Sequence, residues 1–355
     1  RGRAGPAGTG TRGGRRGGKR GIGLTLGGGF GQKRLLKWSV PGIAHFVTFW
    51  AFIILTLTII EAIGALFDPT FALPLIGHWR VVGFAEDLIG TLLLVSLATF
   101  AWLRRTQSPA KIERDSRFYG SHTGPAWLVL FMISMVAVTL FAYRGPQINT
   151  GVFPYRDHVW WTFTSNLVAK ALAPLGESAN LVLETTFILA QVAVIFGFLV
   201  IVVYSKHLHI FLAPINVSTK RDPSNVSLGY ALPMMSNGKV LDFEQADPET
   251  DTFGVGKVED FGWNAYLDMA SCTECGRCQS QCPAWNTGKP LSPKLLIMNL
   301  RDHLFAKAPY ILSKDKEAAL AGAPTAGDNH GHAVPESGYE RIVGSNKEQY
   351  ERPLV

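Results

Sequence analysis

The sequence predicts an all-α protein, in which a polytopic membrane helix bundle of four spans and one interfacial or re-entrant helix precedes a small α-helical module. Three observations predict this fold class. The chain of 355 residues has 47% apolar residues, only 17% charged residues and a mean hydropathy of +0.15, whereas soluble domains average ~25% charged residues. The apolar residues concentrate between residues 41 and 212 in runs that approach the ~20 residues of a membrane-spanning helix. The four cysteines follow these runs and lie together, between residues 272 and 282.

Residues 1–37 form a basic tail. They carry ten Lys and Arg residues and no acidic residue, and the rest of the chain has 24 basic against 27 acidic residues. The Gly- and Arg-rich composition provides too few apolar side chains to bury a core, so the tail is expected to be disordered. Because the excess positive charge is confined to this tail, we expect no nucleic-acid partner, with an RGG-like arm as the alternative. The first residue is not Met, and we expect the sequence to be incomplete at this end.

Four apolar stretches predict membrane spans. They cover residues 41–66, 81–103, 125–143 and 181–204. A fifth stretch, residues 158–175, mixes Trp160 and Trp161 with Lys170. This mixture suits an interfacial or re-entrant helix better than a helix that faces lipid along its whole length.

Basic residues indicate how the spans are oriented. The loop after the second span contains five of them, namely Arg104, Arg105, Lys111, Arg114 and Arg117. Cytoplasmic loops carry an excess of Lys and Arg, so this loop and the basic tail are expected on the cytoplasmic side of the plasma membrane. Four spans then return the chain to the cytoplasm at Lys206, whereas five would export the cysteines. Residues 144–178 are therefore expected at the outer face.

Several carboxylates fall near the predicted outer ends of the spans. They are Glu61, Glu86, Asp87 and Glu184. An ionisable group at membrane depth is costly and usually faces the bundle interior, although a residue at a helix end can simply reach the interface. At 100° per residue, Glu184, Gln191 and His209 fall within roughly 20° of one helix face. Glu184 is therefore a candidate for a proton relay.

Three histidines lie at the predicted cytoplasmic ends of spans. His45 is one turn into the first span, and His207 and His209 end the last. Imidazoles projecting inward from two helices can hold a haem b, and these histidines share the same predicted depth. The alternative is three interfacial histidines with ordinary hydrogen bonds. The helical periodicity favours His209 over His207 as the inward partner of His45.

The cysteines form one compact motif. Cys272, Cys275, Cys278 and Cys282, followed by Pro283, match the C-x2-C-x2-C-x3-C-P run of a [4Fe-4S] site. Structural zinc sites usually split their ligands into two separated pairs, and a cytoplasmic location disfavours disulfides. In two-cluster ferredoxins the fourth cysteine ligates the other cluster. We therefore expect a second motif beyond Val355, the alternative being that Cys282 completes a single site.

The segments around the motif follow from their composition. Residues 213–262 are rich in Pro, Gly, Asn and Asp and are expected to form an ordered connecting loop. Residues 263–310 form the iron-sulfur module, in which Ser292 can cap a helix and Pro293 fits its first position. That helix is expected to cover Leu295 to Phe305. Residues 311–355 are polar and read as a linker toward a further part.

The cysteine run with its downstream Leu291–Lys294 segment, together with Ser205–Ile210 at the end of a span, resembles the membrane-bound iron-sulfur oxidoreductases of the heterodisulfide-reductase type. The resemblance covers about residues 38–305 and is greatest to the members that serve electron-transfer flavoprotein. It implies a nitrate-reductase-gamma-like membrane domain over residues 38–212. By this resemblance Cys272, Cys275 and Cys278 ligate one cluster, Cys282 belongs to its neighbour, and His45 pairs with His207 or His209 around a haem b.

The resemblance also implies a function. Electrons from a reduced electron-transfer flavoprotein of fatty-acid β-oxidation would pass through two [4Fe-4S] clusters, and through a haem b if one is bound, to menaquinone in the lipid bilayer. Two alternatives remain: a quinol-oxidising subunit that delivers electrons to a disulfide or sulfur substrate, and a membrane-anchored iron-sulfur sensor without turnover. The sequence departs from the family pattern at an outer haem, where only Glu61 and Glu184 occupy the corresponding half of the first and last spans. The second cluster motif and the CCG repeats of the family are likewise not found in these residues.

Overall fold

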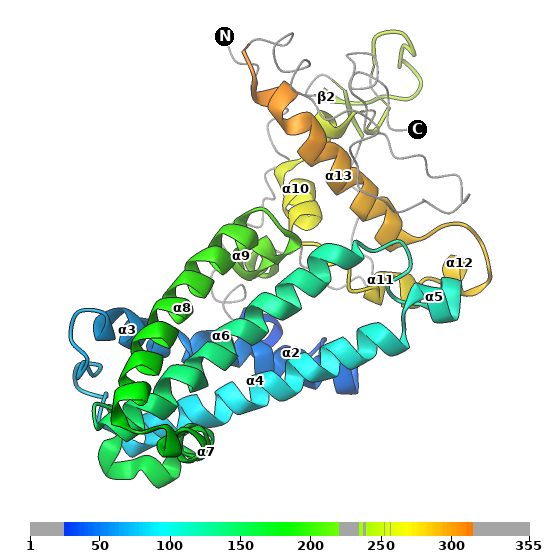
Figure 1. The fold of residues 1–355 in the computed structure, drawn as a ribbon. Helices are drawn as coiled ribbons and strands as arrows, with labels where there is room; N and C mark the ends of the chain where they lie inside the picture. Colours follow the sequence, from blue (N-terminus) through cyan, green and yellow to red (C-terminus); the bar gives the residue numbers. More distant parts are fainter. Residues whose placement is uncertain (1–24, 220–233, 237–238, 252, 256, 315–355) are drawn as a thin grey trace. The chain divides into compact units, whose positions relative to one another are not determined.

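The structure is a computed structural model, and its described residues form two compact units (Figure 1). The described residues are 25–219, 234–236, 239–251, 253–255 and 257–314. The membrane unit consists of Gln32–Glu113 and His122–Ser205. The cysteine unit consists of the described parts of Arg1–Gly31, Arg114–Ser121 and Lys206–Val355. Apart from one short hairpin, the regular elements in these ranges are helices, which confirms the predicted all-α class.

Four long apolar helical segments build the membrane unit. They are α2 (Ser39–Ile54) continued by α3 (Thr56–Ala65), α4 (Arg80–Thr106), α6 (Thr123–Thr150) and α8 (Glu177–Val203). Each segment is long and apolar enough to cross a bilayer. The four predicted spans are thus confirmed, and the chain is a membrane protein.

Small residues line the contacts between these helices. α6 packs against α8, and α2 packs against α4. Ala51, Ala62 and Ala137 are completely buried. At Gly83 on α4, a Cβ atom would lie 2.8 Å from the ring of Tyr155. Small side chains let helix backbones approach closely, and this approach drives association where lipid is as apolar as the helix surface.

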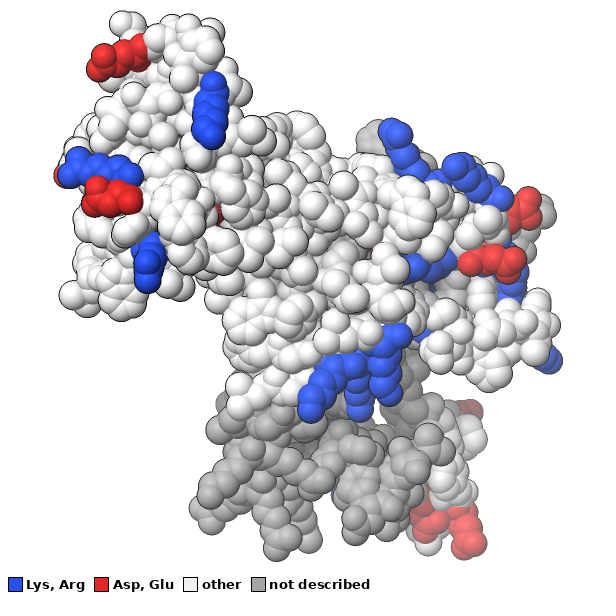
Figure 2. Space-filling view, turned by 90° about the horizontal axis from the view of Figure 1, so that it is seen from below, with Lys and Arg blue, Asp and Glu red and all other residues white. Residues whose placement is uncertain are grey.

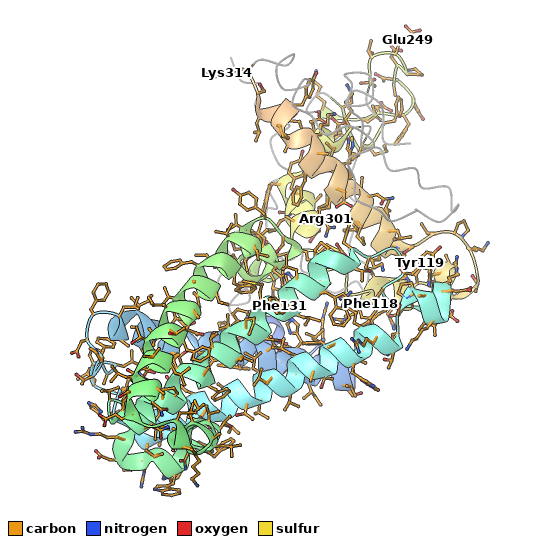
Figure 3. The ribbon with its side chains drawn as sticks, in the orientation of Figure 1. Phe118, Tyr119, Phe131, Glu249, Arg301 and Lys314 are labelled. Atoms are coloured by element: carbon orange, nitrogen blue, oxygen red, sulfur yellow. The ribbon has the colours of Figure 1, made fainter. Side chains whose placement is uncertain are left out.

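Large apolar side chains cover the outside of the bundle. Exposed examples are Leu92, Val95, Phe131, Leu199 and Val200. Figure 2 shows a face of the molecule with a broad area that contains neither Lys and Arg nor Asp and Glu, and Figure 3 labels Phe131 on the outside of α6. In water such a surface would be unfavourable, whereas it matches the hydrocarbon of a membrane.

The segment between α6 and α8 is too short to span. It consists of η3 (Arg156–Trp161), α7 (Phe163–Leu172) and η4 (Ala173–Leu175). The ten residues of α7 are about 15 Å long, half of the ~30 Å hydrocarbon layer. Asp87 of α4 accepts hydrogen bonds from the backbone N–H groups of Thr164 and Ser165, at 2.7 and 2.9 Å. This carboxylate anchors the positive end of α7 to the bundle.

The third span is longer than predicted. The prediction ended it at Tyr143, but α6 continues to Thr150 and stops at Gly151, whose φ of +79° terminates the helix. The prediction ended the span with its apolar run and placed residues 144–178 in an outer-face segment. Arg144 is only 1% exposed and stays inside because carboxylates of two other helices pair with it.

The last span is shorter than the periodicity argument required. α8 ends at Val203, and after η5 (Lys206–Leu208) a separate helix, α9 (His209–Ser218), begins. His209 therefore does not share a helix face with Glu184 and Gln191, which are both buried as expected. Just after the end of α8, Lys206 forms an ion pair with Glu274 at 3.0 Å.

The cysteine unit is assembled from short elements around one longer helix. These are η1 (Thr25–Phe30), α9, the antiparallel hairpin of β1 (Met235–Ser236) and β2 (Lys239–Val240), η6 (Val258–Asp260), α10 (Trp263–Ala270), α11 (Arg277–Ser280), α12 (Pro283–Asn286) and α13 (Pro293–Leu312). α10 packs against both α9 and α13. The Asn216 side chain ties α9 to α10 through hydrogen bonds to Asp268 and Ser271, at 2.9 and 2.7 Å. The predicted loop 213–262 thus contains the second half of α9, the hairpin and η6.

The start of α13 agrees with the prediction. Ser292 Oγ accepts a hydrogen bond from the Leu295 N–H at 3.3 Å, and Pro293 occupies the first helical position. The helix extends to Leu312, beyond the expected end at Phe305 and the module boundary at 310.

Both ends of the sequence lie partly outside the described residues. This holds for residues 1–24 of the predicted tail and for residues 315–355 of the predicted linker. Among the described residues, Thr25–Phe30 form η1, which packs on α9. The disorder of the tail 1–37 stays a prediction.

Candidate functional site

The cysteine run lies in the cysteine unit, between α10 and α13. Cys272 follows α10, Cys278 lies in α11 and Cys282 directly precedes α12. Cys275 and Cys278 are exposed, and Cys272 and Cys282 are half-buried. Within the described ranges, no three His, Cys, Asp or Glu side chains already surround a metal position. The structure therefore brings the four cysteines into one loop without gathering their side chains.

Two residues with positive φ angles shape this loop. Glu274 has a φ of +59° and Gly276 a φ of +79°. A Cβ atom at Gly276 would lie 2.5 Å from the carbonyl oxygen of Arg117, so this position requires glycine for its conformation and for the close approach. The two reversals turn the chain tightly, as is needed for three thiolates close in sequence to bind three different irons of one cubane cluster.

Lys294 at the start of α13 fixes the segment 114–121 beside the cysteine run. Its Nζ atom donates hydrogen bonds to the Arg117 carbonyl at 2.9 Å, the Tyr119 carbonyl at 2.5 Å and Ser121 Oγ at 2.9 Å. The side chain is 1% exposed. These three acceptors use every donor that an ammonium group has.

Glu274 links the cysteine run to two cations. Its carboxylate pairs with Lys206 at 3.0 Å and with Arg301 at 2.8 Å, and Glu274 is 3% exposed. Arg301 also donates to the Cys272 carbonyl at 3.2 Å. Figure 3 labels Arg301 on α13. A buried carboxylate between two cations holds the backbone of the run at a fixed place on α13.

Aromatic and polar contacts complete the frame. The Arg114 guanidinium stacks on the Trp285 ring at 3.7 Å and donates to the Trp285 and Lys289 carbonyls. The Tyr119 ring packs against Trp285 with centroids 5.5 Å apart. Gln279 is buried and accepts a hydrogen bond from Ser292 Oγ at 2.9 Å. The cysteine run is thus enclosed by α13 on one side and by segment 114–121 on the other.

The donor set and its surroundings fit an iron-sulfur cluster. Burial raises the pKa of the Cys272 and Cys278 thiols, and the nearby Arg301 and Lys294 charges act in the opposite direction. Burial lowers the pKa of Lys294 to about 8, while the negative charges of Glu274 and of three of the cysteines raise it. Because thiolate-ligated clusters carry negative charge, the Arg301 and Lys294 charges favour their binding.

The sequence pattern pointed to the candidate ligands but not to the residues that frame them. Lys294 entered only as part of a helix start, and Arg114 and Arg117 only as loop charge. The sequence signal that points to them is the number of basic residues in the loop after the second span, which contains five Lys and Arg residues. Their partners lie up to 177 residues away in the sequence, and no local pattern reveals such pairs.

The candidate haem histidines belong to different units. His45 lies on α2 in the membrane unit, where its Nδ1 atom is 2.9 Å from Gln32 Oε1. His207 and His209 lie in the cysteine unit with ring centroids 5.7 Å apart. His209 is close to the Lys206 carbonyl at 3.1 Å, and burial lowers its pKa, which favours the neutral imidazole that a haem iron binds. The haem pair stays a prediction.

The candidate carboxylates of the membrane unit are buried, as one of the two interpretations expected. The most exposed of Glu61, Glu86, Asp87 and Glu184 is 6% accessible. Glu61 Oε2 and Glu86 Oε2 both accept hydrogen bonds from Arg144 Nη2, at 2.6 and 2.5 Å. Glu184 accepts from Thr150 Oγ1 at 2.7 Å, away from this cluster. Arg144, which joins three helices, was not identified from the sequence.

Known proteins similar to this chain include two oxidoreductases and a ferredoxin. The chain is 31% identical over 304 residues to the EtfAB:quinone oxidoreductase of Syntrophomonas wolfei, covering 82% of this chain and 38% of that protein. It is 30% identical over 285 residues to the probable iron-sulfur-binding oxidoreductase FadF of Bacillus subtilis, with 80% and 37% covered. A probable membrane-anchored ferredoxin of Chromohalobacter salexigens is 31% identical over 275 residues, with 72% and 34% covered.

The chain spans little more than a third of the length of these relatives. No protein-family model matches it, and no solved structure is similar to it. The three relatives agree with the cysteine run and with the four apolar helices described above. The chain therefore belongs with the membrane-associated iron-sulfur oxidoreductases that its cysteine run and its spans resemble.

Proposed function

We propose that this chain is the membrane-anchored part of an oxidoreductase that transfers electrons from a reduced electron-transfer flavoprotein to menaquinone. The observation that carries the proposal is the cysteine run on its buried cationic frame, joined in one chain to four apolar helices. The S. wolfei relative is named for a flavoprotein donor, EtfAB, and a quinone acceptor. Both would be partners of the complete protein.

In this proposal Cys272, Cys275 and Cys278 hold one [4Fe-4S] cluster, and Cys282 ligates a second cluster or completes the first. When bound, such clusters supply one-electron transfer, and the protein controls their potential through charge, hydrogen bonds and solvent access. Lys294 and Arg301 stabilise the added negative charge of a reduced centre. Segment 114–121, held by Lys294, limits solvent access from one side.

Quinone reduction consumes protons as well as electrons. Glu184 is our candidate for a relay group, because it is buried in the bundle and accepts only the Thr150 hydrogen bond among those described. Unchanged quinone turnover in Glu184→Gln would count against this role. We also propose that His45 and either His207 or His209 bind a haem b near the cytoplasmic ends of the spans.

The test uses anaerobically purified full-length protein in detergent. Reduced electron-transfer flavoprotein and a menaquinone analogue are supplied together, and quinone reduction is followed optically. We expect turnover that is lost in Cys275→Ser and retained in Ser280→Ala, an exposed hydroxyl residue nearby. Iron-sulfur signals in electron paramagnetic resonance without any quinone reduction would overturn the proposal. A reduced-minus-oxidised optical spectrum of the same sample reports haem b separately.

A second candidate is an electron carrier that has no quinone site of its own. The C. salexigens relative, named as a probable membrane-anchored ferredoxin, favours it. The carrier would be reduced by the flavoprotein and would need a partner protein to pass electrons on. Reversed flow, from quinol to a disulfide or sulfur substrate, is distinguished by supplying quinol and following cluster reduction.

We propose the plasma membrane as its location, with the cysteine unit in the cytoplasm. The support is the excess of Lys and Arg in residues 1–37, in residues 104–117 and after the last span. We also retain the domain division of the sequence, with the membrane domain at 38–212 and the iron-sulfur module at 263–310.

A further inference from the structure

A buried charge cluster occupies one end of the membrane unit. It joins Glu61 of α3, Glu86 of α4, Arg144 of α6 and Tyr155, which follows α6. Besides the two Arg144 hydrogen bonds, the Tyr155 hydroxyl donates to Glu61 Oε1 at 2.6 Å and lies 3.2 Å from Glu86 Oε2. The members are between 0% and 4% exposed. The Arg144 guanidinium thus ties α6 to α3 and α4, and Tyr155 joins the cluster through the two carboxylates.

The cluster contains one acid more than it has bases. With both carboxylates ionised it would carry a net charge of −1 inside an apolar bundle, and two like charges on one guanidinium disfavour double ionisation. Arginine does not give up its proton in proteins. Asp87, the next residue on α4, is directed to the N-terminus of α7 and accepts three hydrogen bonds there. The simplest neutral state of the cluster therefore holds one extra proton.

The hydrogen bonds indicate which carboxyl group carries this proton. Both oxygens of Glu61 accept hydrogen bonds, Oε1 from Tyr155 and Oε2 from Arg144. Glu86 Oε2 accepts from Arg144, while Glu86 Oε1 is buried without a hydrogen-bond partner among the described residues. Arg144 Nη1 and the Tyr143 hydroxyl are also buried without such a partner. Glu86 Oε1, Arg144 Nη1 and the Tyr143 hydroxyl are thus available to a small polar ligand.

We propose that Glu61, Glu86, Arg144 and Tyr155 form a proton-exchange site inside the membrane, with the proton on Glu86 and with water as the ligand of the unpartnered atoms. Water can donate to Glu86 or accept its proton and can accept from Arg144, so it satisfies the buried polar groups that would otherwise be costly. Loss of the proton to this water leaves Glu86 ionised beside Arg144. The site would supply a proton to quinone reduction, and only this role rests on the proposed function.

The test is infrared spectroscopy of the purified full-length protein in lipid nanodiscs near neutral pH. A protonated glutamic acid gives a carbonyl stretching band separate from that of carboxylates, and ¹³C labelling of glutamate assigns it to this residue type. We expect such a band in the unmodified protein and a shift of the band on transfer to D₂O. The experiment needs neither quinone nor electron donor, so its outcome is independent of the proposed function.

Two isosteric variants and a control assign the band to the Glu61–Glu86 pair. Both are made in a Glu184→Gln background, because buried Glu184 is a second source of such a band. Glu86→Gln then removes the acid, and Glu61→Gln leaves one acid opposite one guanidinium, so each is expected to lose the band. Glu177→Gln, an exposed residue of α8, is the matched control and keeps it. The proposal is overturned if the unmodified protein shows no protonated glutamic acid, if the band survives both cluster variants, or if it does not shift in D₂O. The first of these outcomes needs no variant and therefore does not depend on their folding.

Discussion

Lys294 donates hydrogen bonds to three acceptors in segment 114–121. We predict that Lys294→Met loses ~3 kcal/mol of stability, because three hydrogen bonds from a charged donor are removed and each contributes ~1–3 kcal/mol. The measurement is the thermal midpoint of the detergent-solubilised protein, with iron bound per chain as a second readout. Lys289→Met, which removes an exposed lysine, is the control and should match the unmodified protein. Equal midpoints and equal iron content for both variants would show that Lys294 has no structural role.

Gly276 combines an unusual conformation with a close contact, and glycines elsewhere separate the two effects. Gly288 has a similar φ of +85° but no atom within 4 Å of a Cβ atom, and Gly262 has neither constraint. A left-handed conformation costs ~1–2 kcal/mol for other residues. We expect Gly288→Ala to lose about this amount and Gly262→Ala almost nothing. Gly276→Ala should lose clearly more, because its Cβ atom would also displace the Arg117 carbonyl.

The readout for this series is the urea concentration at half-unfolding, together with iron content. If Gly276→Ala and Gly288→Ala were equally stable, the contact with Arg117 would not matter for the cysteine run.

The sequence identified the cysteines because ligand spacing is local. It did not identify the Arg117 contact, since 159 residues separate the two positions and a glycine inside a cysteine motif has several explanations.

At the scale of elements, one carboxylate holds the N-terminus of α7. We predict that Asp87→Ala frees the N-terminus of α7, with a loss of about 2 kcal/mol or more, because two backbone N–H groups and the Ser165 hydroxyl lose their acceptor inside the bundle. The measurement is hydrogen–deuterium exchange of residues 163–172 in nanodiscs, which should speed up selectively. Asp157→Ala, at an exposed position in η3, should leave the exchange of α7 unchanged. Exchange of α7 that stays slow in Asp87→Ala would contradict the anchoring role.

The predicted spans show how far local patterns reach. Length and hydropathy were sufficient to predict four spanning helices and the shorter α7. The capping residue Ser292 and the following Pro293 were sufficient to predict the start of α13. Helix ends were less accurate, because they depend on distant partners. Arg144 stays in α6 owing to Glu61, which is 83 residues away, and the break after α8 coincides with the ion pair of Lys206 and Glu274. Such pairs are invisible to a periodicity argument.

At the scale of the whole molecule, an even number of spans decides on which side the cysteine unit lies. Four helices place the segment between α3 and α4 on the side opposite to the loop after α4. The Lys and Arg residues of that loop indicate the cytoplasm. A fifth span would place the cysteines outside the cell, where an oxidising environment favours disulfides over free thiols.

Short epitope tags test this topology in spheroplasts of a producing bacterium. One tag follows Leu75, which is 93% exposed between α3 and α4, a second follows Lys111, and a third follows Phe243 in the cysteine unit. We expect antibody to reach the first tag in intact spheroplasts and the other two only after permeabilisation. A tag at Phe243 that is accessible without permeabilisation would refute four spans with a cytoplasmic cysteine unit. Tags that are all accessible only after permeabilisation would place the loop at Leu75 inside and refute the assignment of α2–α3 as a span.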